Sequence, residues 1–176
     1  LKCGFQVQEI LLQHTKSSSA EAKQQTIALF EQVKLPDPES IFNKYPHQIS
    51  GGQKQRVMIA MAIACKPKLL IADEPTTALD VTVQAEIITL LKELQQQTGM
   101  SIIFISHDLS LVSEIANRVL VMYRGEIVEQ GIAEQVFHSP QHLYTQALIS
   151  SRPSLDYRLK RLPTIKDYLE NTVNDE

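Results

Sequence analysis

A short glycine-containing motif, Ile49-Ser50-Gly51-Gly52-Gln53, has the composition of an anion-binding site. We predict that it begins a helix with Ser50 as the N-cap, because an apolar pattern of helical spacing follows it. Two adjacent glycines let a ligand approach the backbone, and the first-turn N–H groups and the helix dipole favour negative charge. A glycine-rich turn before a core helix explains the motif equally well when it is considered alone.

Two adjacent carboxylates, Asp73 and Glu74, end the apolar run Leu69-Leu70-Ile71-Ala72. Such a run is typical of a strand buried on both faces, and open α/β sheets bind ligands at the carboxyl ends of their strands. Asp73 could hold Mg²⁺ through oxygen, and Glu74, pointing to the other side, could accept a proton from an attacking water. The alternative is a charged strand end that faces solvent.

Two further polar residues lie at the ends of predicted elements. Asp80, in Thr77-Ala78-Leu79-Asp80, is predicted to cap a helix, which is a sufficient explanation of that residue. His107 directly follows a second apolar strand, Ile102–Ser106. A lone histidine is more often incidental than catalytic, but neighbouring strand ends converge on one site, which favours a role for His107 there.

The elements that would position these residues are helical at first and alternate strand with helix afterwards. Ser18 and Glu21 fit a capping box that opens a helix ending near Val33, before Pro36 and Pro38. The other predicted elements are helices over 5–14, 50–65, 80–99, 109–117, 133–137 and 142–151, strands over 69–72 and 102–105, and a hairpin of 119–122 with 126–129. The tail from Pro153 is predicted to be loosely ordered. We therefore expect an α/β fold, with a helical subdomain, part of a parallel-sheet core and a small C-terminal hairpin with helices.

Composition narrows the class of protein. The 176 residues are 43% hydrophobic and 21% charged, which is typical of a globular domain with a sizeable core. A formal net charge of -3 argues against a general nucleic-acid-binding surface. No apolar run reaches the roughly 18 residues of a membrane span, so work at a membrane would require docking onto an embedded protein. Cys3 and Cys65 have neither a disulfide framework nor a metal-ligand spacing.

The stretch from Tyr45 to His107 resembles the ATP-binding cassette (ABC) ATPases. It presents the signature motif as ISGGQ, the Walker B motif as LLIADE, the D-loop as ALD and the switch histidine as SHD, in the family's order. Ile49 stands where the family usually has leucine, a change that keeps size and polarity. Two longer stretches, YPHQISGGQKQRVMIAMAIACKPKLLIADEPTTALDVTVQAEI and HSPQHLYTQALISSRP, look like the oligopeptide, dipeptide and nickel importer branch.

This resemblance implies a partial P-loop NTPase fold in which two cassettes sandwich two ATP molecules head to tail. Ser50, Gly51, Gly52 and Gln53 would then touch the γ-phosphate of a nucleotide held by the partner cassette.

The resemblance also implies roles for the remaining polar residues. Asp73 would orient Mg²⁺ and its waters, Glu74 would be the general base, and His107 would hold the γ-phosphate and the attacking water. Asp80 would cross the dimer interface and couple the two sites.

The function implied is that of an ABC-type ATPase, which hydrolyses ATP to energise the uptake of peptides or related solutes. Its partners would be a second ATPase subunit or cassette and transmembrane permease subunits, and it would not bind nucleic acid. It would be a peripheral protein at the cytoplasmic face of the inner (plasma) membrane. We expect residues 1–66 to form the helical signature subdomain, 67–152 the C-terminal part of the α/β core, and 153–176 a tail.

A phosphate-binding loop, G-x-x-x-x-G-K-[ST], is not found in the sequence, because no glycine is followed by Lys and then Ser or Thr. Together with Leu1 in place of a methionine, this suggests a fragment without the Walker A motif or glutamine loop, which does not hydrolyse ATP alone. A truncated sheet would leave an edge or a face uncovered and would favour self-association. The alternatives are a non-transport ABC ATPase, or a non-catalytic half-site module that supplies only the signature helix.

Overall fold

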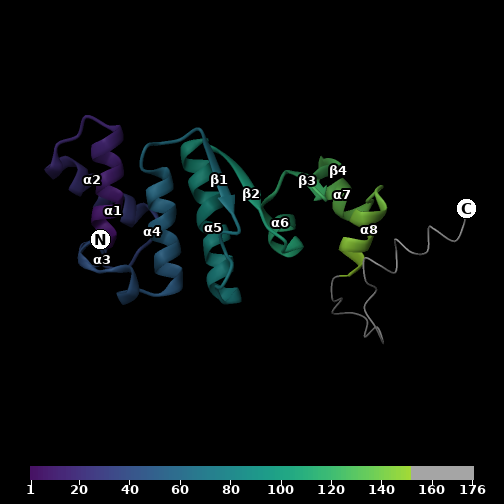
Figure 1. Ribbon diagram of the computed structural model, residues 1–176, viewed down its shortest axis with the longest axis horizontal. Coiled ribbons are helices and arrows are strands. Elements are labelled where there is room, and N and C mark those ends of the chain that lie inside the picture. The colour runs from purple at the N-terminus through teal and green to yellow at the C-terminus, as the bar shows by residue number, and fades with distance from the viewer. Residues whose placement is uncertain (152–176) are drawn as a thin grey trace, which may run out of the picture. The chain divides into compact units, whose positions relative to one another are not determined.

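The computed structural model describes residues 1–151, which fall into two compact units that divide between Ser106 and His107. Helices come first in the chain and strands alternate with helices afterwards, as the sequence predicts (Figure 1). The expected partition into residues 1–66, 67–152 and 153–176 stays a prediction, and the tail from Pro153 lies outside the described residues. Within residues 1–151, no helix has both the length and the apolar character needed to cross a membrane.

The first unit begins with a cluster of helices. They are α1 (Cys3–His14), α2 (Ser19–Gln32), α3 (Pro38–Asn43), the short 3-10 helix η1 (Pro46–Gln48) and α4 (Gly51–Ile63). The predicted capping box opens α2, because the Ser18 hydroxyl accepts from the Glu21 N–H at 3.4 Å and the Glu21 carboxylate accepts from the Ser18 N–H at 2.7 Å. Helix α3 was not predicted: Pro38 is its first residue, where a missing N–H breaks no helical bond, and Asp37 caps it.

The apolar core of this cluster supports α4. Helix α1 packs on α2, α3 and α4, and α2 packs on α3 and α4. The side chains buried between these helices include Val7, Leu11, Phe30, Val33, Ile41 and Val57. Burying a side chain of this size stabilises the fold by about 1.5–3 kcal/mol, so the part of α4 from Val57 onward is held against α1 and α2.

A parallel strand pair and the helix between its strands complete the first unit. Strand β1 (Leu69–Asp73) pairs with β2 (Ser101–Ile105) in a register that places Asp73 opposite Ile105. Helix α5 (Val81–Thr98) connects them, begins at its cap Asp80, and ends at Gly99, which takes a left-handed conformation with φ +70°. Both boundaries of α5 confirm the prediction, and the two carboxyl strand ends lie side by side.

The prediction that β1 and β2 are buried on both faces is wrong for residues 1–151. Leu70 and Ala72 are buried, but Leu69 is 47% exposed, Ile71 62%, and on β2 Ile103 and Ile105 are 47% and 46% exposed. Side chains of a strand point alternately to the two faces of a sheet, and among the described residues only one face of this pair is covered. We call the four exposed side chains the open sheet face.

The second unit is built around an antiparallel hairpin. After α6 (Leu109–Ile115), β3 (Arg118–Tyr123) pairs with β4 (Glu126–Ile132), with an irregularity in the pairing between Val121 and Met122. The turn at Arg124-Gly125 has φ of +51° and +86° at its two residues, as two-residue hairpin loops require. Helices α7 (Ala133–His138) and α8 (Leu143–Ser150) follow, in the positions the sequence predicts.

A carboxylate of the hairpin holds the start of α8. Glu129 accepts hydrogen bonds from the backbone N–H of Gln141 at 2.8 Å and of His142 at 3.0 Å. Burial by itself would raise the pKa of Glu129, but these donors stabilise the charged form and hold the pKa below its ordinary value. The loop before α8 is therefore fixed to β4 by a charge-assisted contact.

Candidate functional site

The N-terminus of α4 is an exposed helix tip closed by a second capping box. The Ser50 hydroxyl accepts from the Gln53 N–H at 3.2 Å, and the Gln53 side-chain oxygen accepts from the Ser50 N–H at 3.0 Å. This confirms Ser50 as the N-cap. Ser50 and Gly51 are exposed, and Gly52 and Gln53 are half-buried. Among residues 1–151 nothing accepts from the N–H groups of Gly51 and Gly52, so this tip presents two amide donors to solvent.

The first turn of α5 lies directly against this tip. A Cβ atom added to Gly51 would lie 3.3 Å from Cδ2 of Leu79, and one added to Gly52 would lie 2.7 Å from Cγ1 of Val83. Both helices begin at the same end of the unit (Figure 1). Asp80, which is exposed, caps α5 by accepting from the Val83 N–H at 3.0 Å. The structure therefore brings Asp80 next to the Ser50 motif, in one unit.

Asp73 and Glu74 lie at the carboxyl end of β1, as predicted. Asp73 is exposed, and Glu74 is half-buried with a left-handed backbone, φ +46°. The Glu74 N–H donates to the Ile105 carbonyl at 2.9 Å, and its carboxylate accepts from the Thr77 hydroxyl at 2.9 Å. A left-handed conformation costs a residue with a side chain about 1–3 kcal/mol, and among the described residues Lys34, Lys66 and Ala78 also adopt it, so the conformation does not by itself mark Glu74 as functional.

Asp73 offers a carboxylate oxygen, the type of ligand that Mg²⁺ prefers, but the described residues do not provide a full set of protein ligands. Within the described part of the chain, no group of three or more His, Cys, Asp or Glu side chains could hold a metal ion. Magnesium bound with a nucleotide needs only one or two carboxylates, because phosphates and waters supply the other oxygens. The exposed Asp73 carboxylate fits that pattern.

His107 is exposed and follows the end of β2 by two residues. The carbonyl that accepts the Glu74 N–H belongs to the last residue of that strand, Ile105. Directly after the histidine, Asp108 caps α6 by accepting from the Ser110 N–H at 2.8 Å. The chain thus places His107 close in sequence to the strand end that holds Glu74, and its role stays a prediction.

Three residues that position this site were not assigned a role from the sequence. Thr77 holds the Glu74 carboxylate, and Leu79 and Val83 support the tip of α4. A hydroxyl three residues after a carboxylate in a turn is a signal that could have identified Thr77. The contacts of Leu79 and Val83 join segments about thirty residues apart, so no local pattern predicts them.

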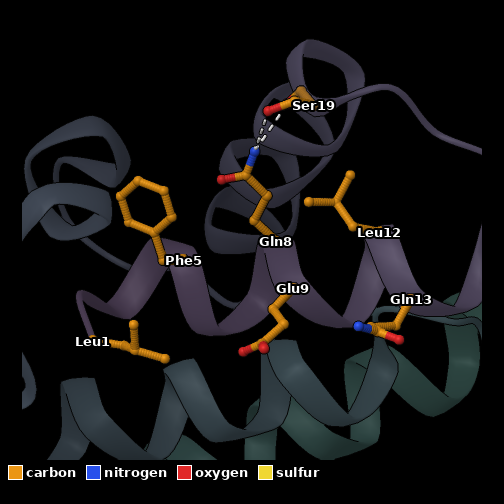
Figure 2. Close-up of a pocket in the computed structure, with 7 residues that line it drawn as sticks. All are labelled: Leu1, Phe5, Gln8, Glu9, Leu12, Gln13 and Ser19. Carbon is orange, nitrogen blue, oxygen red and sulfur yellow. Dashed lines mark hydrogen bonds between the residues drawn. The ribbon is translucent and has the colours of Figure 1, made fainter.

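Neither of two surface hollows in the first unit coincides with the tip of α4. One, of about 330 Å³, lies along α1 (Figure 2), where the Gln8 amide donates to the Ser19 carbonyl at 2.9 Å. The other, of about 760 Å³, lies between α2 and the C-terminal ends of α1, α4 and α5. The residues predicted to bind nucleotide line neither one, so the tip offers donors on an outer surface.

Two family models match the chain. Residues 2–77 match the model described as ABC transporter, and residues 128–175 match the model described as oligopeptide/dipeptide transporter, C-terminal region.

Curated relatives match along most of the chain. The dipeptide transport ATP-binding protein DppD of Escherichia coli K12 is 54% identical over 162 residues, which are 92% of this chain and 50% of that protein. The glutathione import ATP-binding protein GsiA of the same strain is 54% identical over 152 residues, which are 86% of this chain and 24% of that protein. The chain therefore spans about half the length of the dipeptide relative.

Solved structures share the fold. A bacterial ABC transporter cassette, solved as a dimer, matches with a TM-score of 0.66 and 28% identity, over 76% of this chain and 57% of that one. A cassette from Clostridium perfringens, part of the ABC transporter complex cbiONQ, matches with a TM-score of 0.66 and 33% identity, over 76% of this chain and 51% of that one.

Proposed function

Because the chain belongs to the ATP-binding subunits of ABC transporters, in the branch of dipeptide, oligopeptide and glutathione importers, we propose that its α4 tip binds the triphosphate of an ATP held mainly by a partner cassette. The fold is a partial α/β ABC ATPase fold with small parallel and antiparallel sheets. The assembled transporter would hydrolyse ATP to energise the uptake of peptides or related solutes. The chain would act at the cytoplasmic face of the membrane, docked on permease subunits.

The observation that carries this proposal is the exposed α4 tip with its two unused amide donors. The capping box leaves the tip able to bind an anion, because the Ser50 oxygen accepts from Gln53 while the hydroxyl hydrogen stays available to donate. The N–H groups of Gly51 and Gly52 and the helix dipole add to this donor set. The side-chain NH₂ of Gln53 completes it, since only its oxygen is used in the cap.

Hydrolysis would use the carboxyl ends of β1 and β2. A water attacks the γ-phosphorus, Glu74 accepts the proton of that water, and the bond from the γ-phosphorus to the oxygen bridging it to the β-phosphate breaks. The Thr77 hydroxyl donates to the Glu74 carboxylate at 2.9 Å and would help to orient it. Asp73 would bind Mg²⁺, which neutralises charge on the phosphates, and His107 would contact the γ-phosphate. Such catalysis depends mainly on positioning and electrostatics.

The 176 residues contain no G-x-x-x-x-G-K-[ST] sequence, so a phosphate-binding loop from outside these residues would have to hold most of the nucleotide. A hydrogen bond to a charged group contributes about 1.5–3 kcal/mol, and a phosphate-binding loop supplies several. Losing three or four removes much of the roughly 8 kcal/mol that corresponds to micromolar binding. The chain alone is therefore expected to bind ATP weakly and not to hydrolyse it.

Phosphate release, measured for the 176-residue chain and for the assembled transporter, tests the proposal. We expect release only from the transporter, and its loss on Glu74→Gln but not on Glu31→Gln, a matched change of an exposed carboxylate on α2. Steady turnover by the chain alone that Glu74→Gln abolishes would refute the need for a partner. A transporter whose turnover is insensitive to Glu74→Gln would refute the catalytic assignment.

A further inference from the structure

We propose that Val83 is a positioning residue for the α4 tip, and that Gly52 lacks a side chain because Val83 occupies the space a side chain would need. The inference rests on the proposed function, since it concerns how the tip is held for nucleotide. A Cβ on Gly52 would lie 2.7 Å from Cγ1 of Val83 and 3.9 Å from its Cβ and Cγ2. Real Cβ atoms essentially never lie within 3.0 Å of another heavy atom in this way, so either the Val83 side chain or one of the two helices would have to move.

The Val83 side chain has little freedom to turn away. A β-branched side chain in a helix has one strongly preferred rotamer, and its backbone N–H is fixed by the 3.0 Å bond to Asp80. On the other side, the capping box between Ser50 and Gln53 fixes the backbone around Gly52. The contact therefore joins two immobilised first turns.

A further contact joins the same two helices. Arg56 of α4 donates to the Glu86 carboxylate of α5 at 2.9 Å, and also to the Val33 carbonyl at 2.9 Å. A methyl group at position 52 cannot be accommodated by moving α4 without loosening these contacts. The displacement would instead fall on the tip that presents the amide donors.

The first turn of α5 is also bound to the loop that carries Glu74. The Gln84 amide donates to the Thr76 carbonyl at 3.2 Å, and Thr77 donates to the Glu74 carboxylate at 2.9 Å. One short segment of α5 thus sets the position of the α4 tip through Val83 and of the carboxylate loop through Gln84. The two halves of the nucleotide machinery share this support.

Two explanations of Gly52 make opposite predictions. If Gly52 is glycine because the nucleotide approaches its backbone, removing bulk from Val83 cannot restore a Gly52→Ala variant. If Gly52 is glycine because of Val83, then Val83→Ala makes room for the new methyl group and restores the tip. Gly51 is the matched control, since an added Cβ there faces Leu79, not Val83.

The experiment is a double-mutant cycle on the KM for ATP and on kcat in the assembled transporter. We expect Gly52→Ala to raise KM at least about tenfold, Val83→Ala about threefold or less, and the double variant to return to within about threefold of Val83→Ala. Gly52→Ala with Val83→Thr, which keeps the branched shape, should stay impaired. Gly51→Ala should not be restored by Val83→Ala.

A double variant as impaired as Gly52→Ala, with an unchanged thermal unfolding midpoint, would overturn the role of Val83. If the double variant does not fold, Val83→Ile with Gly52 intact replaces it: the extra methyl group should raise KM, and an unchanged KM overturns the inference. The proposed function fails separately, if Glu74→Gln and Ser50→Ala leave the transporter's ATP hydrolysis unchanged.

Discussion

Replacing Ser50 by alanine separates its structural role from its nucleotide-binding role, because the chain contains a second capping box for comparison. Ser18 caps α2 with the same pair of hydrogen bonds that Ser50 makes at α4. The serine hydroxyl accepts from the backbone N–H three residues ahead at 3.4 Å in α2 and 3.2 Å in α4, and the serine N–H donates to the side chain of that residue at 2.7 Å and 3.0 Å. Loss of a serine N-cap costs about 1 kcal/mol. In a unit of this size that lowers Tm by roughly 4–8 °C, and we expect similar losses for Ser50→Ala and Ser18→Ala.

Only the Ser50 variant should affect the nucleotide. A hydroxyl that donates to a phosphate oxygen contributes about 1.5–3 kcal/mol, which corresponds to about a 10- to 150-fold loss of ATP affinity. Ser50→Asp sharpens the comparison: aspartate is as good an N-cap as serine, so Tm should be kept while its charge repels the triphosphate.

Thermal unfolding of the 176-residue chain, followed by circular dichroism, measures the effect of each substitution on stability. The KM for ATP of the assembled transporter measures its effect on nucleotide binding. If Ser50→Ala lowers Tm as Ser18→Ala does and leaves KM unchanged, the serine is a helix cap and nothing more, and the nucleotide assignment of the α4 tip is wrong.

Three further changes test other parts of the structure. Asp80→Asn should keep Tm, because asparagine is an equally good cap, but should reduce the cooperativity of ATP hydrolysis in the transporter; unchanged cooperativity contradicts a coupling role for the carboxylate. Glu129→Gln should destabilise the second unit by about 1 kcal/mol near neutral pH, because hydrogen bonds to a charged acceptor are stronger than those to a neutral one. The pKa of Glu129 in the folded chain lies below its ordinary value of 4.5. The extra stability that glutamate gives over glutamine is therefore complete above pH 4.5 and is lost as the pH falls through the folded pKa. If urea unfolding shows the same loss of stability for Glu129→Gln at pH 7 and at pH 3, the proposed role of the charged Glu129 contact is wrong. Ile71→Lys, on the open sheet face, should reduce self-association of the chain in light scattering relative to Lys68→Ala, and a wild-type chain that is monomeric at all concentrations contradicts that expectation.

Much of the fold was predictable because its boundaries are local. Ser18, Ser50 and Asp80 each bond to an N–H three residues ahead, and Gly99 ends α5 through its own φ of +70°. Such signals need no knowledge of the rest of the chain. Helix α3 was missed because a proline can either end one helix or begin the next, and the choice at Pro38 depends on the burial of α3 against α1 and α2.

The parts of the site that could not be predicted depend on contacts distant in sequence. The apolar runs of β1 and β2 are the same whether a sheet is covered on one face or on two, so the exposure of Ile71 and Ile103 is not encoded in either strand. The contact of Gly52 with Val83 likewise joins two helices whose local patterns are ordinary. From the sequence, Gly51 and Gly52 suggest that a ligand approaches the backbone. In the structure, the space beside Gly52 is occupied by Val83 of the same chain.

The left-handed backbone at Glu74 has a consequence for a glycine substitution at this position. For any L-residue other than glycine, a left-handed conformation costs about 1–3 kcal/mol, and among the described residues Lys34, Lys66 and Ala78 bear the same cost. Glycine at position 74 would remove this strain together with the carboxylate. Glu74→Gly should therefore abolish turnover while leaving Tm unchanged or higher, a combination that distinguishes a residue kept for chemistry from one kept for architecture.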